Sequence, residues 1–193
     1  LWESYLDNLR SSFTNEIFKS VDELCSDLLT SWRNSSKVFI CGNGGSAANA
    51  IHIANDLIYG AAQSQSSNNK ELEKGLDVEA LTANSGVLTC LANDIGYDHI
   101  FSYQLETKAQ KGDLLIALSG SGNSANIINA LQCAQKLSLK THSILGFDGG
   151  KCKSISDNTI HIDVNDMQIA EDSQLIIGHL CMKRLNQINQ ENL

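Results

Sequence analysis

The sequence predicts an α/β fold: a three-layer, flavodoxin-like sandwich in which helices cover both faces of a parallel sheet of about five strands. Short, continuously apolar runs such as 37–41 and 114–118 indicate buried strands. Segments with helical periodicity separate these runs. The 193 residues suffice for one domain of ordinary size, and neither a repeat nor a linker divides them. We therefore expect a single domain over residues 1–193.

The elements follow in chain order from the same patterns. Apolar residues recur every three or four positions across 2–32, which predicts an amphipathic helix that packs against an apolar partner in an oligomer. Strands are expected at 37–41, 78–82, 114–118, 141–147 and 160–164, and further helices at 46–59, 85–107, 124–136 and 167–189. The segment 61–74 is rich in Ser, Gln and Asn and is expected to be a long loop.

Composition argues against several classes of function. The chain has 22 acidic and 14 basic residues, for a net charge of −8, whereas a surface for nucleic acid or anionic membrane needs a basic patch. No segment approaches the ~18 uninterrupted apolar residues of a membrane span. The six cysteines include no C-x-x-C pair and lie in apolar segments, which indicates reduced, buried thiols in a cytoplasmic protein.

Two glycine-rich turns each join a predicted strand to a predicted helix: CGNGGSA at 41–47 and LSGSGNS at 118–124. Backbone N–H groups at a helix start, together with nearby hydroxyls, bind phosphate without Lys or Arg. The hydroxyls of Ser46, Ser119, Ser121 and Ser124 can each donate a hydrogen bond. A serine-capped turn explains either loop alone. Two such loops at strand ends, where α/β proteins bind ligands, favour a phosphate site.

Both turns also fit the loose dinucleotide pattern G-x-G-x-x-A, from Gly42 and from Gly120. That interpretation requires an acidic residue at the end of the next strand. The strand after the first turn ends in LTANS, at 81–85, without a carboxylate. No nucleotide cofactor is therefore expected.

The helix predicted at 46–59 carries a candidate acid–base pair. His52 and Asp56 are four residues apart and therefore neighbours on the helix surface. A helical wheel places them, with Asn49, opposite an apolar side that consists of Ala47, Ala50, Ile51, Ala54 and Ile58. An imidazole beside a carboxylate transfers protons or binds a metal. A solvent-exposed helix face on which His52 and Asp56 are neighbours without a functional role explains the pattern as well.

The closing helix at 167–189 offers Glu171 and His179 as further candidates. Eight residues separate their Cα atoms by ~12 Å along a helix axis, so both side chains reach a single ion only at full extension. There is a simpler alternative for each residue: Glu171 only stabilises the helix N-terminus by its charge, and His179 is a packed interior histidine. The spacing alone does not decide between them.

Taken together, these residues resemble the sedoheptulose 7-phosphate isomerases (phosphoheptose isomerases) of the sugar isomerase (SIS) domain superfamily. The resemblance covers nearly the whole chain and rests on CGNGGS at 41–46, His52-x-x-x-Asp56, Ala92-Asn93-Asp94, Ser119-x-Ser121-Gly122-Asn123-Ser124, Asp148-Gly149-Gly150-Lys151 and Ile177-Gly178-His179. It implies a homotetramer with active sites at subunit interfaces. The implied reaction interconverts sedoheptulose 7-phosphate and D-glycero-D-manno-heptose 7-phosphate, for nucleotide-activated heptose and surface polysaccharide such as lipopolysaccharide.

The resemblance also implies roles for individual residues. The implied substrate-binding residues are Asn43, Gly44, Gly45, Ser46, Asn93, Asp94, Ser119, Ser121, Ser124 and Glu171. Asp56 is the implied base and His179 its acid/base partner. The implied metal ligands, for one Zn²⁺ per chain, are His52, Asp56, Glu171 and His179. The family usually has Glu at position 56 and Gln at position 171, and a second carboxylate facing the first favours a cation between them.

Two alternatives belong to other classes of protein. A bacterial relative with similar loops is a non-catalytic SIS-domain tetramer that associates with the replication initiator. That relative lacks the carboxylate on the second helix, so Asp56 together with His179 favours an enzyme. Regulators that sense sugar phosphates usually add a DNA-binding domain, for which 193 residues leave no room.

Overall fold

The computed structural model describes residues 2–62 and 74–191. Within them, five parallel strands form one sheet in the order β2-β1-β3-β4-β5. The strands are β1 (Val38–Gly42), β2 (Val78–Ala80), β3 (Leu114–Ser119), β4 (Lys140–Leu145) and β5 (Asn158–His161). This strand order is the flavodoxin-like one, and it confirms the predicted fold class.

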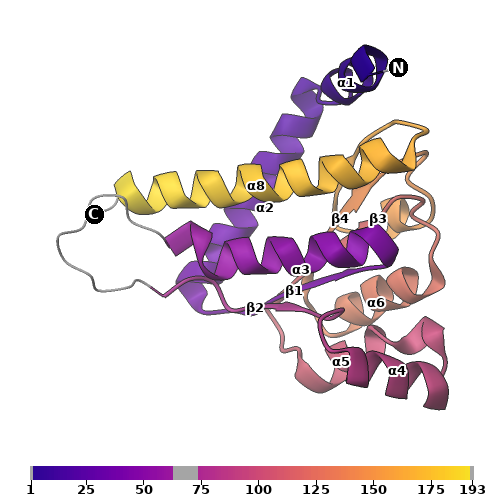
Figure 1. The fold of residues 1–193 in the computed structure, drawn as a ribbon. Helices are drawn as coiled ribbons and strands as arrows, with labels where there is room; N and C mark the ends of the chain where they lie inside the picture. The colour runs from indigo at the N-terminus through magenta and orange to yellow at the C-terminus, as the bar shows by residue number, and fades with distance from the viewer. Residues whose placement is uncertain (1, 63–73, 192–193) are drawn as a thin grey trace.

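Helices cover both faces of the sheet (Figure 1). One face carries α2 (Asn15–Asn34), α3 (Gly44–Ile58) and α8 (Met167–Glu191), and the other carries α4 (Ser85–Asp94), α5 (Ser102–Lys108), α6 (Ala125–Lys136) and α7 (Cys152–Ile155). Successive strand residues point to opposite faces, so β1 contributes to two cores. Val38 and Ile40 pack with the first set of helices, and Phe39 and Cys41 with the second.

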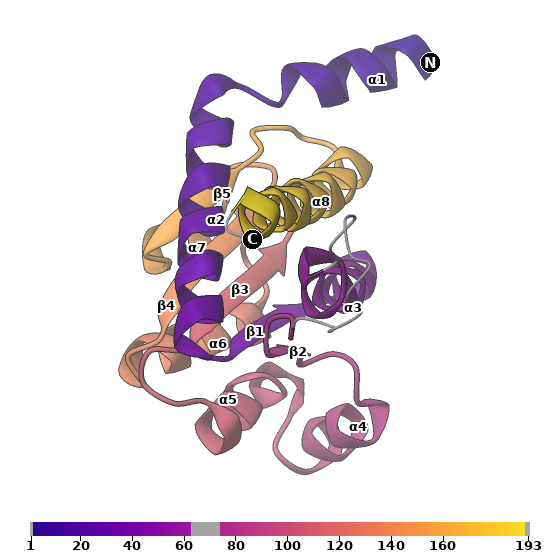
Figure 2. The same ribbon diagram turned by 90° about the vertical axis from the view of Figure 1, so that its left-hand side faces the viewer.

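The single helix predicted over 2–32 is two helices. Helix α1 (Trp2–Ser11) ends before Thr14, which caps the start of α2 by accepting a hydrogen bond from Ile17 N through its side chain (3.4 Å). Helix α1 has no buried residue and lies at the edge of the molecule (Figure 2), where Tyr5 Oη donates to Asp172 Oδ2 of α8 (2.6 Å). The apolar periodicity continues across this break, which is why the sequence pattern alone did not show it.

Other boundaries also differ from the expectation. The helical segment predicted at 85–107 consists of α4, a 3₁₀ turn η2 (Tyr97–His99) and α5, and Gly96 at φ 94° breaks the chain direction after α4. Strand β5 begins and ends earlier than predicted, and α7 was not predicted. The expected loop at 61–74 begins inside the 3₁₀ turn η1 (Gly60–Ala62), and its residues 63–73 lie outside the described residues.

Helix α3 packs along α8 (Figures 1 and 2). The close approach depends on Gly178, where an added Cβ would lie 2.5 Å from the Ile53 side chain. The buried side of α3 consists of Ala50, Ile53, Ala54 and Leu57. Ile51 and Ile58, which the helical wheel assigned to the apolar side, are 45 % and 48 % exposed. The wheel was wrong for these two residues because α8 and the sheet together select which side of α3 is covered.

Two expectations from composition can be compared with the described residues. None of the described helices combines the length and apolar character needed to cross a membrane. All six cysteines are free thiols, and five of them are buried as expected. Cys90, on α4, is exposed.

Candidate active site

The second glycine-rich turn joins β3 to α6 and is ordered by its own hydrogen bonds. Ser119 is buried, and its Oγ accepts a hydrogen bond from Gly122 N (3.1 Å). Ser121 Oγ accepts one from Asn123 N (3.3 Å). Ser124 is the N-cap residue of α6, but its side chain makes no capping hydrogen bond. A serine cap therefore does not account for this turn, and the Ser124 hydroxyl remains available to a ligand at the start of α6.

A cavity of about 480 Å³ lies beside this turn. Its lining residues are Ser121, Asn123, Phe147, Asp148, Asp163 and Asn165. Ser121 thus opens onto solvent, whereas Ser119 lies beneath the turn. The turn provides hydroxyl and backbone N–H donors, as an anionic group requires, whereas the rest of the cavity wall includes the carboxylates of Asp148 and Asp163.

The first glycine-rich turn joins β1 to α3, and Gly44 and Gly45 begin the helix. Asn43, at the N-cap, forms a reciprocal amide pair with Asn126 of α6, with N···O distances of 2.9 and 2.8 Å. This pair ties the two glycine-rich turns together. Ser46 is only 4 % exposed, so its hydroxyl is less accessible to a ligand than the sequence suggested.

The structure also places Tyr97 at the first turn, where its hydroxyl donates to Asn43 Oδ1 (3.0 Å). Neither Tyr97 nor Asn126 was among the predicted site residues. Asn126 carries one local signal, because it is an amide on the otherwise apolar buried side of its helix. Tyr97 carries no such local signal, because its partner Asn43 lies 54 positions away in the sequence.

Three of the predicted ligands converge between α3 and α8. We call His52, Asp56 and His179 the histidine cluster. The two Nε2 atoms are 3.0 Å apart, and each lies 3.4 Å from Asp56 Oδ2. The imidazole rings meet edge to face, at 70°. The side chains of His52 and His179 are 48 % and 42 % exposed, whereas that of Asp56 is 18 % exposed.

These distances fit a metal ion. Ligand atoms at tetrahedral positions on bonds of ~2.0–2.1 Å lie about 3.3 Å apart, close to the three separations of the histidine cluster. Two imidazole nitrogens that face each other without a proton repel, so the pair requires either a shared proton or a cation. The three atoms form a possible metal site, to which a fourth ligand from solvent or substrate can add.

Glu171 does not join this group among the described residues. Its carboxylate lies instead against the α carbon of Gly45, where an added Cβ would overlap both carboxylate oxygens. Asn49 fixes this region by donating to Glu171 O (2.9 Å) and to Gln174 Oε1 (3.2 Å). The spacing of eight positions from Glu171 to His179 places the two side chains about two helical turns apart, at different ends of the site.

Asn93 and Asp94 lie at the end of α4, on the exposed surface. Asn93 Nδ2 donates to Asp94 Oδ1 (2.8 Å), and Cys90 Sγ donates to Asp94 Oδ2 (3.5 Å). The hydrogen bond to Asp94 and its charge raise the pKa of the Cys90 thiol, which keeps it protonated. No hydrogen bond joins Asn93 or Asp94 to either glycine-rich turn within the described ranges.

Helix geometry separates the histidine cluster from the turns. Asp56 follows Gly44 within the same helix, and the 1.5 Å rise per residue places it about 18 Å farther along the axis. The reciprocal amide pair keeps the second turn close to the start of α3. The turns and the histidine cluster therefore lie at different levels along α3 within one chain.

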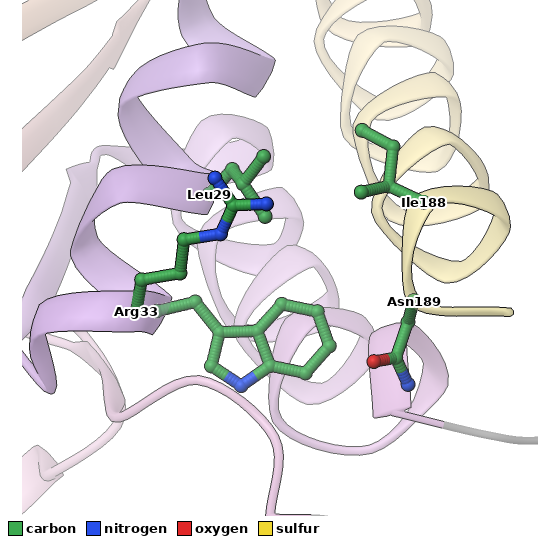
Figure 3. Close-up of a pocket in the computed structure, with 5 residues that line it drawn as sticks. Leu29, Arg33, Ile188 and Asn189 are labelled. Atoms are coloured by element: carbon green, nitrogen blue, oxygen red, sulfur yellow. The ribbon is translucent and has the colours of Figure 1, made fainter. Parts of the chain in front are cut away.

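Another cavity, of about 290 Å³, lies between the ends of α2 and α8 (Figure 3). It is lined by Leu29, Trp32, Arg33, Ile188 and Asn189. None of the predicted site residues belongs to it.

Comparison with known proteins shows the family. The SIS domain family matches residues 2–146. The phosphoheptose isomerase of Aliarcobacter butzleri is 41 % identical over 147 residues, which are 76 % of this chain and 74 % of that protein. The phosphoheptose isomerase of Aneurinibacillus thermoaerophilus is 33 % identical over 165 residues, which are 86 % of this chain and 79 % of that protein.

A solved structure agrees with these relatives. The phosphoheptose isomerase GmhA from Neisseria gonorrhoeae superposes with a TM-score of 0.85 at 25 % identity, and the match covers 96 % of this chain and 95 % of that one. Its fold matches over nearly the whole length, including the helices that carry the histidine cluster. The chain therefore belongs to the phosphoheptose isomerase family of SIS-domain proteins.

Proposed function

We propose that this protein interconverts sedoheptulose 7-phosphate and D-glycero-D-manno-heptose 7-phosphate. The observation that carries the proposal is the position of Asp56 Oδ2, 3.4 Å from the Nε2 atoms of both His52 and His179. A carboxylate beside imidazoles is the equipment of a proton-transfer enzyme. The names of the relatives support the same reaction. They do not favour the replication-initiator partner as an alternative.

The chemistry is an aldose–ketose isomerisation through an enediol. Asp56 removes the proton from the hydroxyl-bearing carbon next to the carbonyl and returns it to the neighbouring carbon. His179 moves the second proton between the two sugar oxygens through Nδ1, because Nε2 is the atom that would hold the metal. We assign the proton abstraction to the Asp56 oxygen that does not face the histidines, because Oδ2 is engaged with both Nε2 atoms.

The second glycine-rich turn is the proposed phosphate site. Its support is the hydroxyl of Ser124, which makes no capping bond, and the position of Ser121 at a cavity. Hydroxyl and N–H donors at the start of α6 suit a dianion in an acidic protein. Asn43, Gly44 and Gly45 of the first turn are proposed to contact the sugar, with Asn93, Asp94, Glu171 and Ser46 as further binding residues.

We propose that the active site is completed by a second copy of the chain, in a homotetramer. Along α3, the backbone rises about 18 Å from Gly44 to Asp56, whereas a seven-carbon sugar phosphate spans roughly 10 Å at bond lengths near ~1.5 Å. Apolar side chains beside the histidine cluster are exposed, with Ile51 at 45 % and Leu180 at 36 %. The unburied helix α1 offers a further apolar surface, through Trp2 and Leu6. Residues 1–193 would act as one domain in this assembly.

Zinc is the proposed metal, held by His52, Asp56 and His179. When bound, Zn²⁺ would supply a Lewis acid that polarises the sugar carbonyl. The fit rests on the separations of the three ligand atoms and on their chemistry, two nitrogens and one oxygen. The Glu171 carboxylate, which lies against Gly45, is the less suitable ligand.

Metal content tests the zinc site. Protein purified without chelator should contain close to one equivalent of zinc per chain, and the combined change His52→Ala and His179→Ala should remove it, because one carboxylate alone binds zinc weakly. Glu171→Gln should keep the metal, as a matched variant outside the cluster. Full metal retention in the double variant would overturn this assignment.

The reaction itself is tested by a coupled assay on a panel of ketose phosphates. Sedoheptulose 7-phosphate should be converted to the aldose, and unphosphorylated sedoheptulose should be a far poorer substrate because it lacks the anion that the second turn binds. The aldose product would feed nucleotide-activated heptose and surface polysaccharide such as lipopolysaccharide. Absence of turnover on the whole panel by zinc-loaded protein would overturn the proposal.

A further inference from the structure

Three side chains from distant parts of the chain meet at the first glycine-rich turn. Asn43 and Asn126 exchange two amide hydrogen bonds, at 2.9 and 2.8 Å. Tyr97 Oη adds a third hydrogen bond, to Asn43 Oδ1, at 3.0 Å. Asn43 precedes α3, Asn126 belongs to the first turn of α6, and Tyr97 begins η2. One side chain is thus held from two directions.

Helix α6 anchors both partners of Asn43. Asn126 is 2 % exposed, so its amide is fixed within the protein. Asn129 lies one helical turn later on α6, and its Nδ2 donates to Asp98 O (2.9 Å), next to Tyr97. Residues three apart lie on the same helix face. Helix α6 therefore holds the Asn43 amide through Asn126, and the backbone next to Tyr97 through Asn129. Tyr97 itself is 56 % exposed, so its hydroxyl contributes this contact without being part of a core.

The side-chain amide of Asn43 has one hydrogen-bonding group left for a ligand. An amide oxygen has two lone pairs, and Tyr97 and Asn126 occupy both. One of the two amide N–H groups is donated to Asn126 Oδ1. The remaining N–H group is the one that stays available. Asn43 therefore presents a donor, and no acceptor, at the start of α3.

We propose that Tyr97 and Asn126 are positioning residues that fix the Asn43 amide so that its remaining N–H donates to an oxygen of the sugar. The proposal rests on the isomerase function proposed above. A rotated Asn43 amide would place a carbonyl oxygen where a donor is needed, and the bond to substrate would be lost. Tyr97 does not touch substrate in this scheme and acts only through Asn43.

Tyr97→Phe tests the proposal, because it removes one exposed hydroxyl and leaves the ring. The KM for sedoheptulose 7-phosphate should rise about 3- to 10-fold, the scale of one neutral hydrogen bond, while kcat stays within about twofold. Inhibition by inorganic phosphate should be unchanged, because the second turn is untouched. Tyr103→Phe, at a similarly exposed tyrosine on α5, is the matched control and should behave as the unaltered protein.

A double-mutant cycle separates positioning from a structural role. In an Asn43→Ala background, Tyr97→Phe should change KM by less than about 1.5-fold, because the residue through which it acts is gone. Additive effects, or an unchanged KM in Tyr97→Phe alone, would overturn the inference. If the unaltered protein does not convert the sugar at all, the proposed function fails instead. Asn126→Ser should raise KM in the same direction, and an unchanged KM would exclude it as a positioning residue.

Discussion

The second glycine-rich turn and the histidine cluster are built in opposite ways. The turn is ordered from within, because Ser119 is buried and bonded to Gly122 N, and the Asn43–Asn126 pair ties it to the neighbouring turn. The cluster consists of two nearly half-exposed imidazoles and one carboxylate, whose side-chain polar contacts within the described residues are with one another. One chain thus orders both glycine-rich turns through its own hydrogen bonds. It leaves the proposed catalytic half open to a cation, a substrate and a second subunit.

The largest expected effect on activity comes from substitutions in the histidine cluster. Asp56→Asn and His179→Ala should each lower kcat by about 10² or more, the scale of a positioned acid or base. The melting temperature should change little, because the two imidazoles are nearly half-exposed and the two helices are held by Ile53, Gly178 and their apolar neighbours. Steady-state kinetics and thermal unfolding of the purified variants measure both quantities.

Glu106→Gln, which neutralises an exposed carboxylate on α5, is the control and should retain full activity. Activity at the unaltered rate in both Asp56→Asn and His179→Ala would show that the cluster has no catalytic role. A large loss of stability in either variant would contradict the contrast between the two halves.

Mixed oligomers test whether the two halves of one site come from different chains. Ser121→Asp places a carboxylate in the proposed phosphate turn and should abolish binding by charge repulsion. Asp56→Asn should abolish catalysis. When the two inactive variants are unfolded and reassembled together, about a quarter of the sites should combine an intact turn with an intact cluster, and activity should return to that level.

The same mixture has a clear opposite outcome. If both halves of the site belong to one chain, every site contains one defect and the mixture stays inactive. Sedimentation should find a tetramer for each variant before mixing, and a stable monomer at micromolar concentration would remove the interface altogether.

The smallest expected effect concerns stability away from the site. Burial lowers the pKa of His142 below its ordinary 6.5, although the Asp27 carboxylate, 2.7 Å away, acts in the opposite direction. Because the folded pKa is the lower one, the unfolded chain binds more protons as the pH falls below 6.5. The contribution of His142 to the free energy of unfolding should therefore be complete above pH 6.5, and the free energy of unfolding should decrease as the pH falls below that value.

Urea unfolding at several pH values measures this dependence. His142→Gln should flatten it, since the substituted side chain does not titrate. The kcat profile should not change in this variant, because His142 lies on β4 and contacts α2 through Asp27. An equal shift of the activity profile would indicate that the site and the fold respond to the same group.

Local patterns were sufficient for the parts of the site that lie at strand ends. The apolar runs ending at Gly42 and Ser119 predicted two central strands and the turns that follow them, and the structure contains both. His52 and Asp56 were also predictable as neighbours, because a helix brings residues four apart together. Ile51 and Ile58 were misassigned, since the wheel shows which residues share a side but not which side another element covers.

The fold class, the positions of both glycine-rich turns and the pairing of His52 with Asp56 could all be predicted from the sequence, because each depends on periodicity or spacing within one element. In contrast, tertiary packing is what brings His179 into the cluster, turns Glu171 toward Gly45 and lets Tyr97 and Asn126 hold Asn43. These contacts join residues far apart in the chain. Their geometry follows from how α3, α6 and α8 pack on the sheet, and no local pattern encodes that packing.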